Sequence, residues 1–131
     1  MERMTVRTRR RKELVDITAE VAAVVAAAGV SRGICHVFVP HTTCGITLNE
    51  RADPSVRDDM LAALARIVPA DAGYRHAEGN SDAHLQASLV GHAVTIPIRE
   101  TRLSLGVWQA LFLCEFDGPR AREVVVTVLP V

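Results

Sequence analysis

The chain has 131 residues, the length of one domain that can bury a hydrophobic core without disulfides or structural metals. Fifteen Lys and Arg balance fifteen Asp and Glu, so no overall field attracts nucleic acid or an anionic membrane surface. Its three cysteines are odd in number and form no Cys-x-x-Cys pair, which argues against a disulfide framework or a thiolate zinc site.

The N-terminal stretch contains no apolar signal region, and no apolar run in the chain is long enough to cross a bilayer. We therefore expect a cytoplasmic protein with a single domain over residues 1–131.

Residues 5–12 are rich in Thr, Val and Arg, which predicts a strand with one solvated face. Arg7, Arg9 and Arg11 fall on that face. They suggest either a phosphate or nucleic-acid patch or a charged edge that resists aggregation, and the neutral net charge favours the second interpretation.

Capping residues and apolar spacing indicate two helices in the first half of the chain. The first is expected to run from a cap at Asp16 or Thr18 to about residue 28. The second is expected to begin at Asp53-Pro54, because a capping aspartate followed by proline is a strong start signal, and to end before Pro69. Both helices are interpreted as scaffold.

Short apolar runs bounded by turn residues predict the further strands 34–39, 45–48, 93–98, 106–116 and 123–129. Alternation along residues 106–116 predicts a core-facing set made of Trp108, Ala110, Phe112, Cys114 and Phe116. The turn at residues 117–120 is expected to join the last two strands as a hairpin. Strands with irregularly interleaved helices are typical of the α+β class, so we expect a mostly antiparallel, sandwich-like sheet covered by helices.

Three histidines lie in polar segments between these elements rather than in apolar stripes, namely His41, His76 and His84. Imidazole binds metals and moves protons near neutral pH. One hypothesis is that the three, or two of them with a carboxylate, bind a divalent cofactor ion, Mg²⁺ or Zn²⁺, and leave a position open to water or a phosphate oxygen. The alternative without a metal makes them acid, base and phosphate-binding groups.

The segment between His76 and His84 predicts an anion-binding feature. Asn80 or Ser81 can cap a short helix over residues 82–90, and both histidines flank its start. Backbone N–H groups without helical partners are available at a helix N-terminus, where the dipole also favours negative charge. We therefore expect a phosphate-like group to bind there.

Two polar pairs beside predicted strands are further candidates. Glu50, with Asn49 before it, supplies a carboxylate that suits a base or a partner of a histidine, although a solvated turn acid is an equal alternative. Trp108 beside Gln109 is either a core anchor or the wall of a pocket for a planar ring.

Arg120 is a candidate for binding a phosphate, because a guanidinium presents a planar fork that matches phosphate and carboxylate oxygens. The alternative is structural. Arg120 follows Asp117-Gly118-Pro119, and pairing with Asp117 or Glu115 would hold that turn.

Several of these segments occur together in a recognisable order. They are His41-Thr42-Thr43-Cys44-Gly45-Ile46-Thr47, Asn49-Glu50, Ala52-Asp53-Pro54, His76 to Gly79-Asn80 to His84, Leu105-Gly106-Val107-Trp108-Gln109 and Asp117-Gly118-Pro119-Arg120. The combined pattern resembles the YjbQ-like (UPF0047) family, small cytoplasmic proteins described as secondary thiamine-phosphate synthases. It departs from that family at Cys44, where a small residue such as alanine is expected, and at Asp82, whose position is variable.

The resemblance implies an enzyme that joins an aminopyrimidine diphosphate to a thiazole phosphate, releases pyrophosphate and forms thiamine phosphate, either as its main activity or as a side activity. It implies phosphorylated small molecules as partners and a homotrimeric assembly. On this basis the catalytic residues are His41, Glu50, His84 and Arg120, and the substrate-binding residues are Thr42, Asn49, Asn80, Gln109 and Arg120. The alternative function is a non-catalytic protein that binds a metal or a phosphorylated metabolite.

Overall fold

The computed structural model describes residues 1–131, which form eight strands and three helices. In chain order the elements are β1 (Glu2–Arg7), β2 (Glu13–Asp16), α1 (Thr18–Ala28), β3 (Arg32–Phe38), β4 (Cys44–Glu50), α2 (Pro54–Ile67), α3 (Ser81–Val90), β5 (Ala93–Arg99), β6 (Arg102–Leu103), β7 (Gln109–Glu115) and β8 (Ala121–Pro130).

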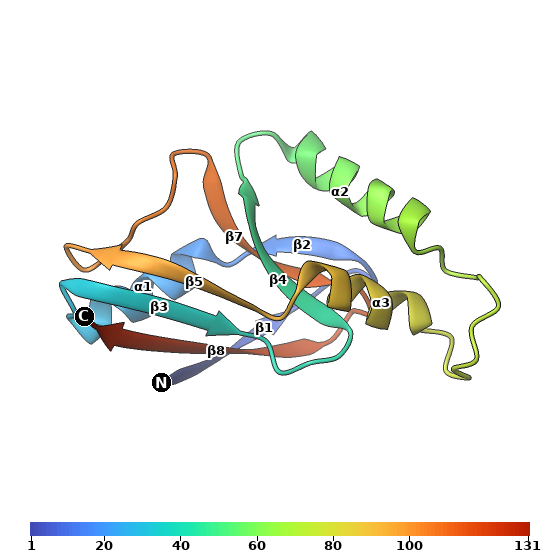
Figure 1. Cartoon of the computed structure of the whole chain (residues 1–131), viewed down its shortest axis with the longest axis horizontal. Coiled ribbons are helices and arrows are strands. Elements are labelled where there is room, and N and C mark those ends of the chain that lie inside the picture. Colours follow the sequence, from blue (N-terminus) through green and yellow to red (C-terminus); the bar gives the residue numbers. More distant parts are fainter.

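The strands form two antiparallel sheets, shown in Figure 1. The large sheet has the order β1-β8-β3-β5-β6, and the small sheet has the order β2-β7-β4. Every strand pair in both sheets is antiparallel. The structure therefore confirms the predicted α+β class with antiparallel sheets.

The main core lies between the two sheets and α1. Strand alternation places every second side chain of the large sheet on this side, where it meets the small sheet and the helix. The buried members are Ile17, Val21, Val25, Cys35, Val37, Val39, Cys44, Ile46, Ile96, Ile98, Leu111, Leu113, Val124 and Val126.

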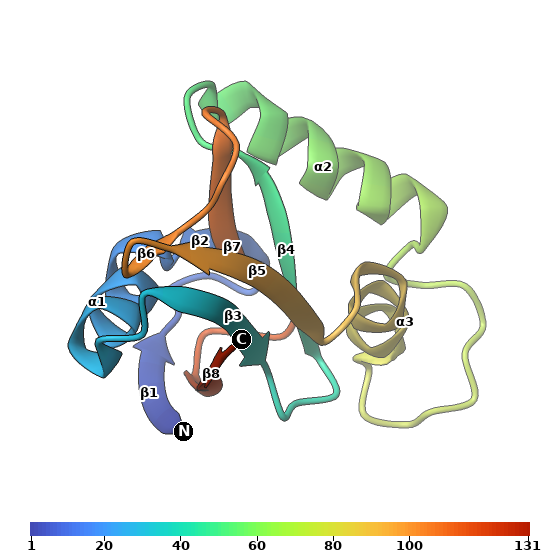
Figure 2. The ribbon, with the colours of Figure 1, turned by 60° about the vertical axis from the view of Figure 1, so that its left-hand side comes forward.

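A second apolar cluster covers the opposite face of the small sheet. Ala110, Phe112 and Cys114 of β7 pack there with Ala83 and Ala87 of α3. Partly buried side chains of α2 complete the cluster. Figure 2 shows α2 and α3 on the side of the small sheet away from α1. Because β7 is the central strand and is covered on both faces, both of its alternating sets are buried.

The helix boundaries follow the local signals. Gly29 ends α1 in the left-handed conformation, with φ +66°, which glycine adopts without the usual steric cost. The side chain of Asp53 accepts a hydrogen bond from Ser55 N at 2.9 Å, and Pro54 occupies the first turn of α2. None of the three helices is both long and apolar enough to span a bilayer.

Two predictions about the C-terminal half are wrong. Strands β7 and β8 are not a hairpin, because β7 pairs with β2 and β4 whereas β8 pairs with β1 and β3. Residues 117–120 instead carry the chain from one sheet to the other. Trp108 is 62% exposed and precedes β7, so it does not belong to the core.

The first strand also differs from the prediction, since β1 ends at Arg7 and residues 8–12 form a loop. This loop folds around Glu13, whose carboxylate accepts hydrogen bonds from the backbone N–H groups of Arg9 and Arg10 at 2.5 and 3.0 Å. Arg11 turns toward α3 and pairs with Asp82. The three arginines therefore do not share one strand face.

Candidate functional site

His76 and His84 lie against each other at the start of α3. Their ring centroids are 5.3 Å apart, and the rings meet edge to face at 85°. His84 is in the first turn of the helix, with its N–H donating to Asn80 O at 3.3 Å, and His76 Nε2 lies 3.8 Å from the Glu78 carboxylate. The loop before α3 therefore folds back over the helix start and presents two imidazoles together.

Asp117 joins this helix start to the turn at residues 117–120. Asn80 Nδ2 donates a hydrogen bond of 2.9 Å to Asp117 Oδ2. Arg120 Nη2 donates to the same oxygen at 3.2 Å, and its Nε donates to Asp117 O at 2.9 Å. The structure thus brings together two predicted site residues from distant parts of the chain. The pairing of Arg120 with Asp117 is the contact expected from its alternative, structural role. The Arg120 side chain is half exposed, and its Nη1 has no partner in the chain.

Asp82 is a buried anchor that the sequence analysis did not select. Its side chain is 2% exposed and accepts a hydrogen bond from Lys12 Nζ at 2.6 Å and one from Arg11 Nη2 at 3.2 Å. Burial opposes ionisation, but the hydrogen bond from Lys12 and the charges of Lys12 and Arg11 outweigh it and lower the pKa of Asp82. The carboxylate therefore fixes α3 to the loop at residues 8–12. No local sequence signal marks this contact, because Arg11 and Lys12 lie about 70 residues before Asp82 in the chain.

His41 lies at the start of β8 rather than with the other two histidines. Its Nε2 accepts a hydrogen bond of 2.9 Å from the backbone N–H of Glu123, so the proton of the neutral ring resides on Nδ1. Burial, followed by the charge of Arg122, lowers the pKa of His41, although the charges of Glu123 and Glu115 act in the opposite direction. The lowered pKa favours the neutral imidazole, in which Nδ1 is the nitrogen that can donate. Thr42 is exposed beside it.

A buried ion pair between Glu115 and Arg122 stabilises the region around His41. Glu115 and Arg122 are 0% and 2% exposed, and Arg122 Nε donates to Glu115 Oε1 at 2.9 Å while Nη2 donates to Oε2. Arg122 Nη2 also donates to Oγ1 of Thr43 at 2.8 Å. Glu115 accepts further hydrogen bonds from Thr8 Oγ1 at 2.7 Å and from Asp117 N at 3.1 Å. One ion pair thus connects the loop after His41, the 117–120 turn and the end of β1.

Cys44 follows this loop but is not a nucleophile. It is fully buried, and burial, more than any nearby charge, raises the pKa of its thiol to about 12. A thiol protonated to that degree is inert at neutral pH. This agrees with the absence of an activating sequence pattern around it.

The remaining predicted site residues lie at the far end of the small sheet. Glu50 of β4 pairs in register with Gln109 of β7. Asn49 contacts the sulfur of Met60, and Gln109 Oε1 accepts a hydrogen bond of 2.8 Å from Gly106 N. Strands rise about 3.3 Å per residue, so the seven residues of β4 put this end roughly 20 Å from the His41 end. Within one chain, Glu50, Asn49 and Gln109 are therefore separate from the predicted residues at the His41 end.

The predicted metal site does not assemble within one chain. No group of three or more His, Cys, Asp or Glu side chains converges anywhere in residues 1–131. His76 and His84 supply two nitrogens, whereas His41 Nε2 already accepts a backbone hydrogen bond. A zinc site needs at least three protein ligands. The donor set of one chain therefore does not fit a resident zinc ion.

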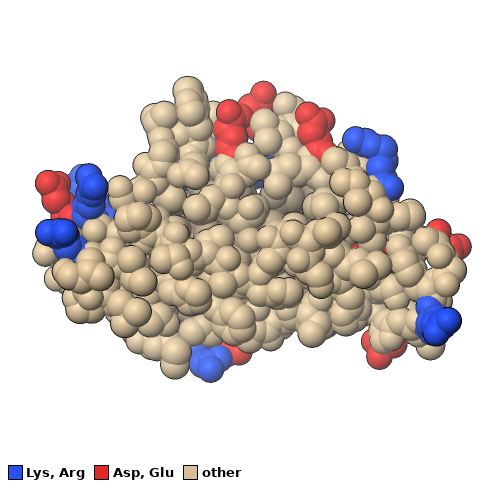
Figure 3. Space-filling model, viewed as in Figure 1, with Lys and Arg blue, Asp and Glu red and all other residues tan.

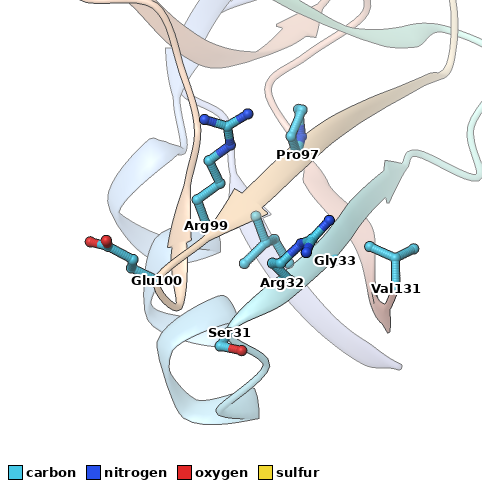
Figure 4. A pocket seen from close by; sticks show the side chains of 8 residues that line it. Ser31, Arg32, Gly33, Pro97, Arg99, Glu100 and Val131 are labelled. Carbon is cyan, nitrogen blue, oxygen red and sulfur yellow. The ribbon is translucent and has the colours of Figure 1, made fainter.

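The largest hollow on the molecule is not lined by any of the predicted site residues. It has a volume of about 610 Å³, and Arg32, Arg99 and Val131 are among the residues that line it, as Figure 4 shows. It lies at the end of β3 opposite to His41. None of the predicted site residues lines this hollow or the three smaller ones. The candidate residues therefore occupy open surface in the single chain.

Arg120→Lys separates the two roles of Arg120. Lysine keeps the charge but loses the planar fork, so affinity for a phosphorylated ligand should weaken by roughly tenfold while the melting temperature changes little. Calorimetric titration and thermal unfolding of the variant measure both quantities. A large fall in melting temperature with unchanged affinity would show that Arg120 serves the Asp117 turn alone.

The chain matches one family, both in its overall sequence pattern and in its similarity to individual proteins. The sequence pattern of the family described as UPF0047 protein YjbQ-like matches residues 2–131. A UPF0047 protein of Methanocaldococcus jannaschii is 47% identical over 124 residues, covering 95% of this chain and 90% of its own length. The UPF0047 protein YugU of Bacillus subtilis is 40% identical over 130 residues, covering 98% of both proteins.

Solved structures agree with these sequence matches. A crystal structure of a YjbQ/UPF0047 protein from Clostridium acetobutylicum superposes with a TM-score of 0.96 at 44% identity, covering 98% of this chain and 100% of the other. A conserved hypothetical protein from Thermus thermophilus gives a TM-score of 0.92 at 45% identity, covering 98% and 100%. The match extends over nearly the whole length in each case, and the chain therefore belongs to the YjbQ-like UPF0047 family.

Proposed function

We propose that this protein is a secondary thiamine-phosphate synthase, which joins an aminopyrimidine diphosphate to a thiazole phosphate. The observation that carries the proposal is the meeting of two distant segments at the start of α3. The His76–His84 pair lies there with Asn80, and Asp117 connects Asn80 to Arg120. These groups suit a phosphorylated substrate, because imidazoles, a guanidinium and helix N–H groups all bind phosphate oxygens.

The proposed reaction breaks the bond between the pyrimidine methylene carbon and the diphosphate oxygen. The thiazole nitrogen forms the new bond to that carbon, and both electrons of the broken bond leave with pyrophosphate. The difficult part is the negative charge that develops on the leaving group, which preorganised donors stabilise. His84 and Arg120 are proposed to supply these donors, with His76 and Asn80 orienting the diphosphate.

His41 is proposed to act as a hydrogen-bond donor rather than as a base. Its Nε2 accepts the Glu123 backbone N–H, so Nδ1 carries the proton and is the nitrogen available to a ligand. A neutral donor of this kind stabilises an anionic oxygen without requiring protonation of the ring. Thr42, exposed beside it, is proposed to contribute its hydroxyl.

Glu50, Asn49 and Gln109 can join the same site only if a second copy of the chain supplies them, because they lie roughly 20 Å away along β4. We propose that the homotrimer brings these residues of one chain to the His41 end of its neighbour. An assembly surface is available on the outer face of the large sheet, which Figure 3 shows as a broad area with charges only at its margins. Uncharged side chains that alternate with core residues on this face include Ile34, His36, Phe38, Ala93, Thr95, Pro97, Val125, Thr127 and Leu129.

A divalent ion remains part of the proposal, with Mg²⁺ favoured over Zn²⁺. Magnesium keeps several waters and is usually bound through substrate phosphates and only one or two protein groups. Such an ion would neutralise the leaving diphosphate. Its requirement is compatible with a chain that offers no group of three ligands.

The direct test is release of pyrophosphate when the purified protein is mixed with both substrates, with Mg²⁺ or Zn²⁺ in parallel. Formation of thiamine phosphate above the level of a His84→Ala control supports the synthase. Binding of the phosphorylated substrates without turnover would identify a non-catalytic metabolite-binding protein instead. Faster turnover of another phosphorylated substrate would make the synthase a side activity.

A mixing experiment tests the shared site. His41→Ala and Glu50→Gln are each expected to be inactive alone, but co-expressed chains should recover activity, because a mixed trimer contains some sites with neither change. The two variants are purified with different tags so that mixed assemblies can be isolated. Mixed trimers that stay inactive would place all catalytic residues within one chain.

A further inference from the structure

Arg57 of α2 stands between two adjoining hollows on the side of the small sheet that α2 covers. The hollows have volumes of about 270 and 310 Å³. They share Glu13, Leu14 and Arg57 in their walls, so they are parts of one depression. None of the residues assigned to the proposed synthase site lines it.

The position of the Arg57 side chain is unusual for a structural arginine. Its guanidinium carbon lies 5.2 Å from the centre of the Phe112 ring, which is fully buried. Its Nε is inaccessible to solvent and has no hydrogen-bond partner in the chain. A buried donor without a partner is costly, and a charged one more so. The contact with Phe112 holds the guanidinium in place, and its two Nη groups, which make no hydrogen bond within the chain, are available to a ligand.

Most of the cations around the depression are not neutralised. Arg7, Arg9, Arg10 and Arg57 line it, and none of their side chains takes part in an ion pair. Lys12 also lines it but pairs with Asp82.

The neighbouring carboxylates are largely engaged by their own segments. Glu13 accepts the backbone N–H groups of Arg9 and Arg10, and Asp16 accepts both the N–H and the hydroxyl of Thr18. Asp58 is the remaining carboxylate of the lining and makes no ion pair within the chain. The depression therefore has an excess of positive charge on a protein whose net charge is zero.

We propose that this depression is a second anion-binding site, which takes a diphosphate or a small molecule with two phosphoryl groups. Arg57 lies at the junction and contacts both groups. Arg10 lines one hollow and contacts one group, whereas Arg7 at the end of β1 and Arg9 line the other hollow and contact the second group. Two adjoining hollows with a guanidinium between them suit a ligand with two linked phosphates better than a ligand with a single phosphate. The proposal does not depend on the synthase activity.

The test uses inorganic pyrophosphate as the probe, titrated into the full-length protein at low ionic strength. Amide NMR spectra locate each binding event, and we expect shifts at residues 9–14 and 55–61. Orthophosphate should bind more weakly than pyrophosphate. Because loss of a charge-assisted hydrogen bond is worth about one order of magnitude in affinity, Arg57→Gln should weaken binding roughly tenfold.

Three further variants make the result specific. Arg66→Gln is the matched control, because Arg66 is an exposed arginine of the same helix that lines neither hollow, and its affinity should equal that of the unaltered protein. His84→Ala should also leave these shifts unchanged, which separates this site from the proposed synthase site. If Arg57→Gln does not fold, the double variant Arg9→Gln/Arg10→Gln in the exposed loop provides the same test. Unmoved signals at residues 9–14 and 55–61, or equal affinities of Arg57→Gln and Arg66→Gln, overturn the proposal.

Discussion

Glu115→Gln is expected to lower the free energy of unfolding by about 3 kcal/mol or more, since breaking a buried ion pair leaves an uncompensated charge. Arg122 is 2% exposed, and Glu115 is the only carboxylate with which it pairs. The glutamine retains the size of the side chain but loses the negative charge and one acceptor oxygen. Urea-induced unfolding, followed by circular dichroism, measures the change.

Glu123→Gln is the matched control for this prediction. Glu123 pairs with Arg3, but both side chains are about half exposed, and an exposed ion pair contributes roughly 0–1 kcal/mol. The two substitutions are chemically identical, but Glu115 is buried and accepts further hydrogen bonds, whereas Glu123 is half exposed and accepts only from Arg3. Equal losses of stability in the two variants would show that the buried pair has no special structural role.

His41→Ala and His84→Ala are each expected to lower the proposed synthase activity by roughly a hundredfold or more, the usual loss when one preorganised hydrogen-bond donor to a developing anion is removed. Both variants should remain folded, because both residues lie at the ends of elements and neither belongs to the two apolar clusters. Activity is measured as pyrophosphate release, and folding by thermal unfolding.

His36→Ala is the control for the histidine variants. His36 lies on the outer face of the large sheet, where its Nδ1 is 3.2 Å from the hydroxyl of Thr95. Because His36 also lies on the proposed assembly surface, its replacement should affect the stability of the fold or of the trimer more than the activity of the trimers that form. Unfolding of either test variant, or full activity in both, would show that the site is wrongly assigned.

The sequence predicted best those features that neighbouring residues determine. Asp53 caps α2 through the N–H of Ser55, two residues away, so the start of that helix depends on local chemistry alone. The same holds for Gly29 at the end of α1. The meeting of His76 and His84 was also predicted, because the intervening residues are few and the helix start fixes their direction.

Contacts between distant segments were beyond the sequence analysis. The prediction of a hairpin between β7 and β8 assumed that neighbouring strands pair, but β7 pairs with β2 and β4 in the small sheet, and β8 pairs with β1 and β3 in the large sheet. Asp82 was classed as a variable position, and only the fold brings Lys12 and Arg11 to it across about 70 residues. The pairing of Glu115 with Arg122 depends likewise on the crossing of the chain between the sheets.

By itself, the sequence determined the α+β class, the family and the segments that carry the candidate site. Periodicity, capping and motif order are properties of short stretches, and short-range sterics and hydrogen bonding enforce them. Only the tertiary structure decided that His41 binds the backbone of Glu123, that Glu50 lies at the opposite end of β4, and that Arg57 has no partner. Burial and charge pairing arise from the packing of whole sheets and helices, and no local pattern encodes them.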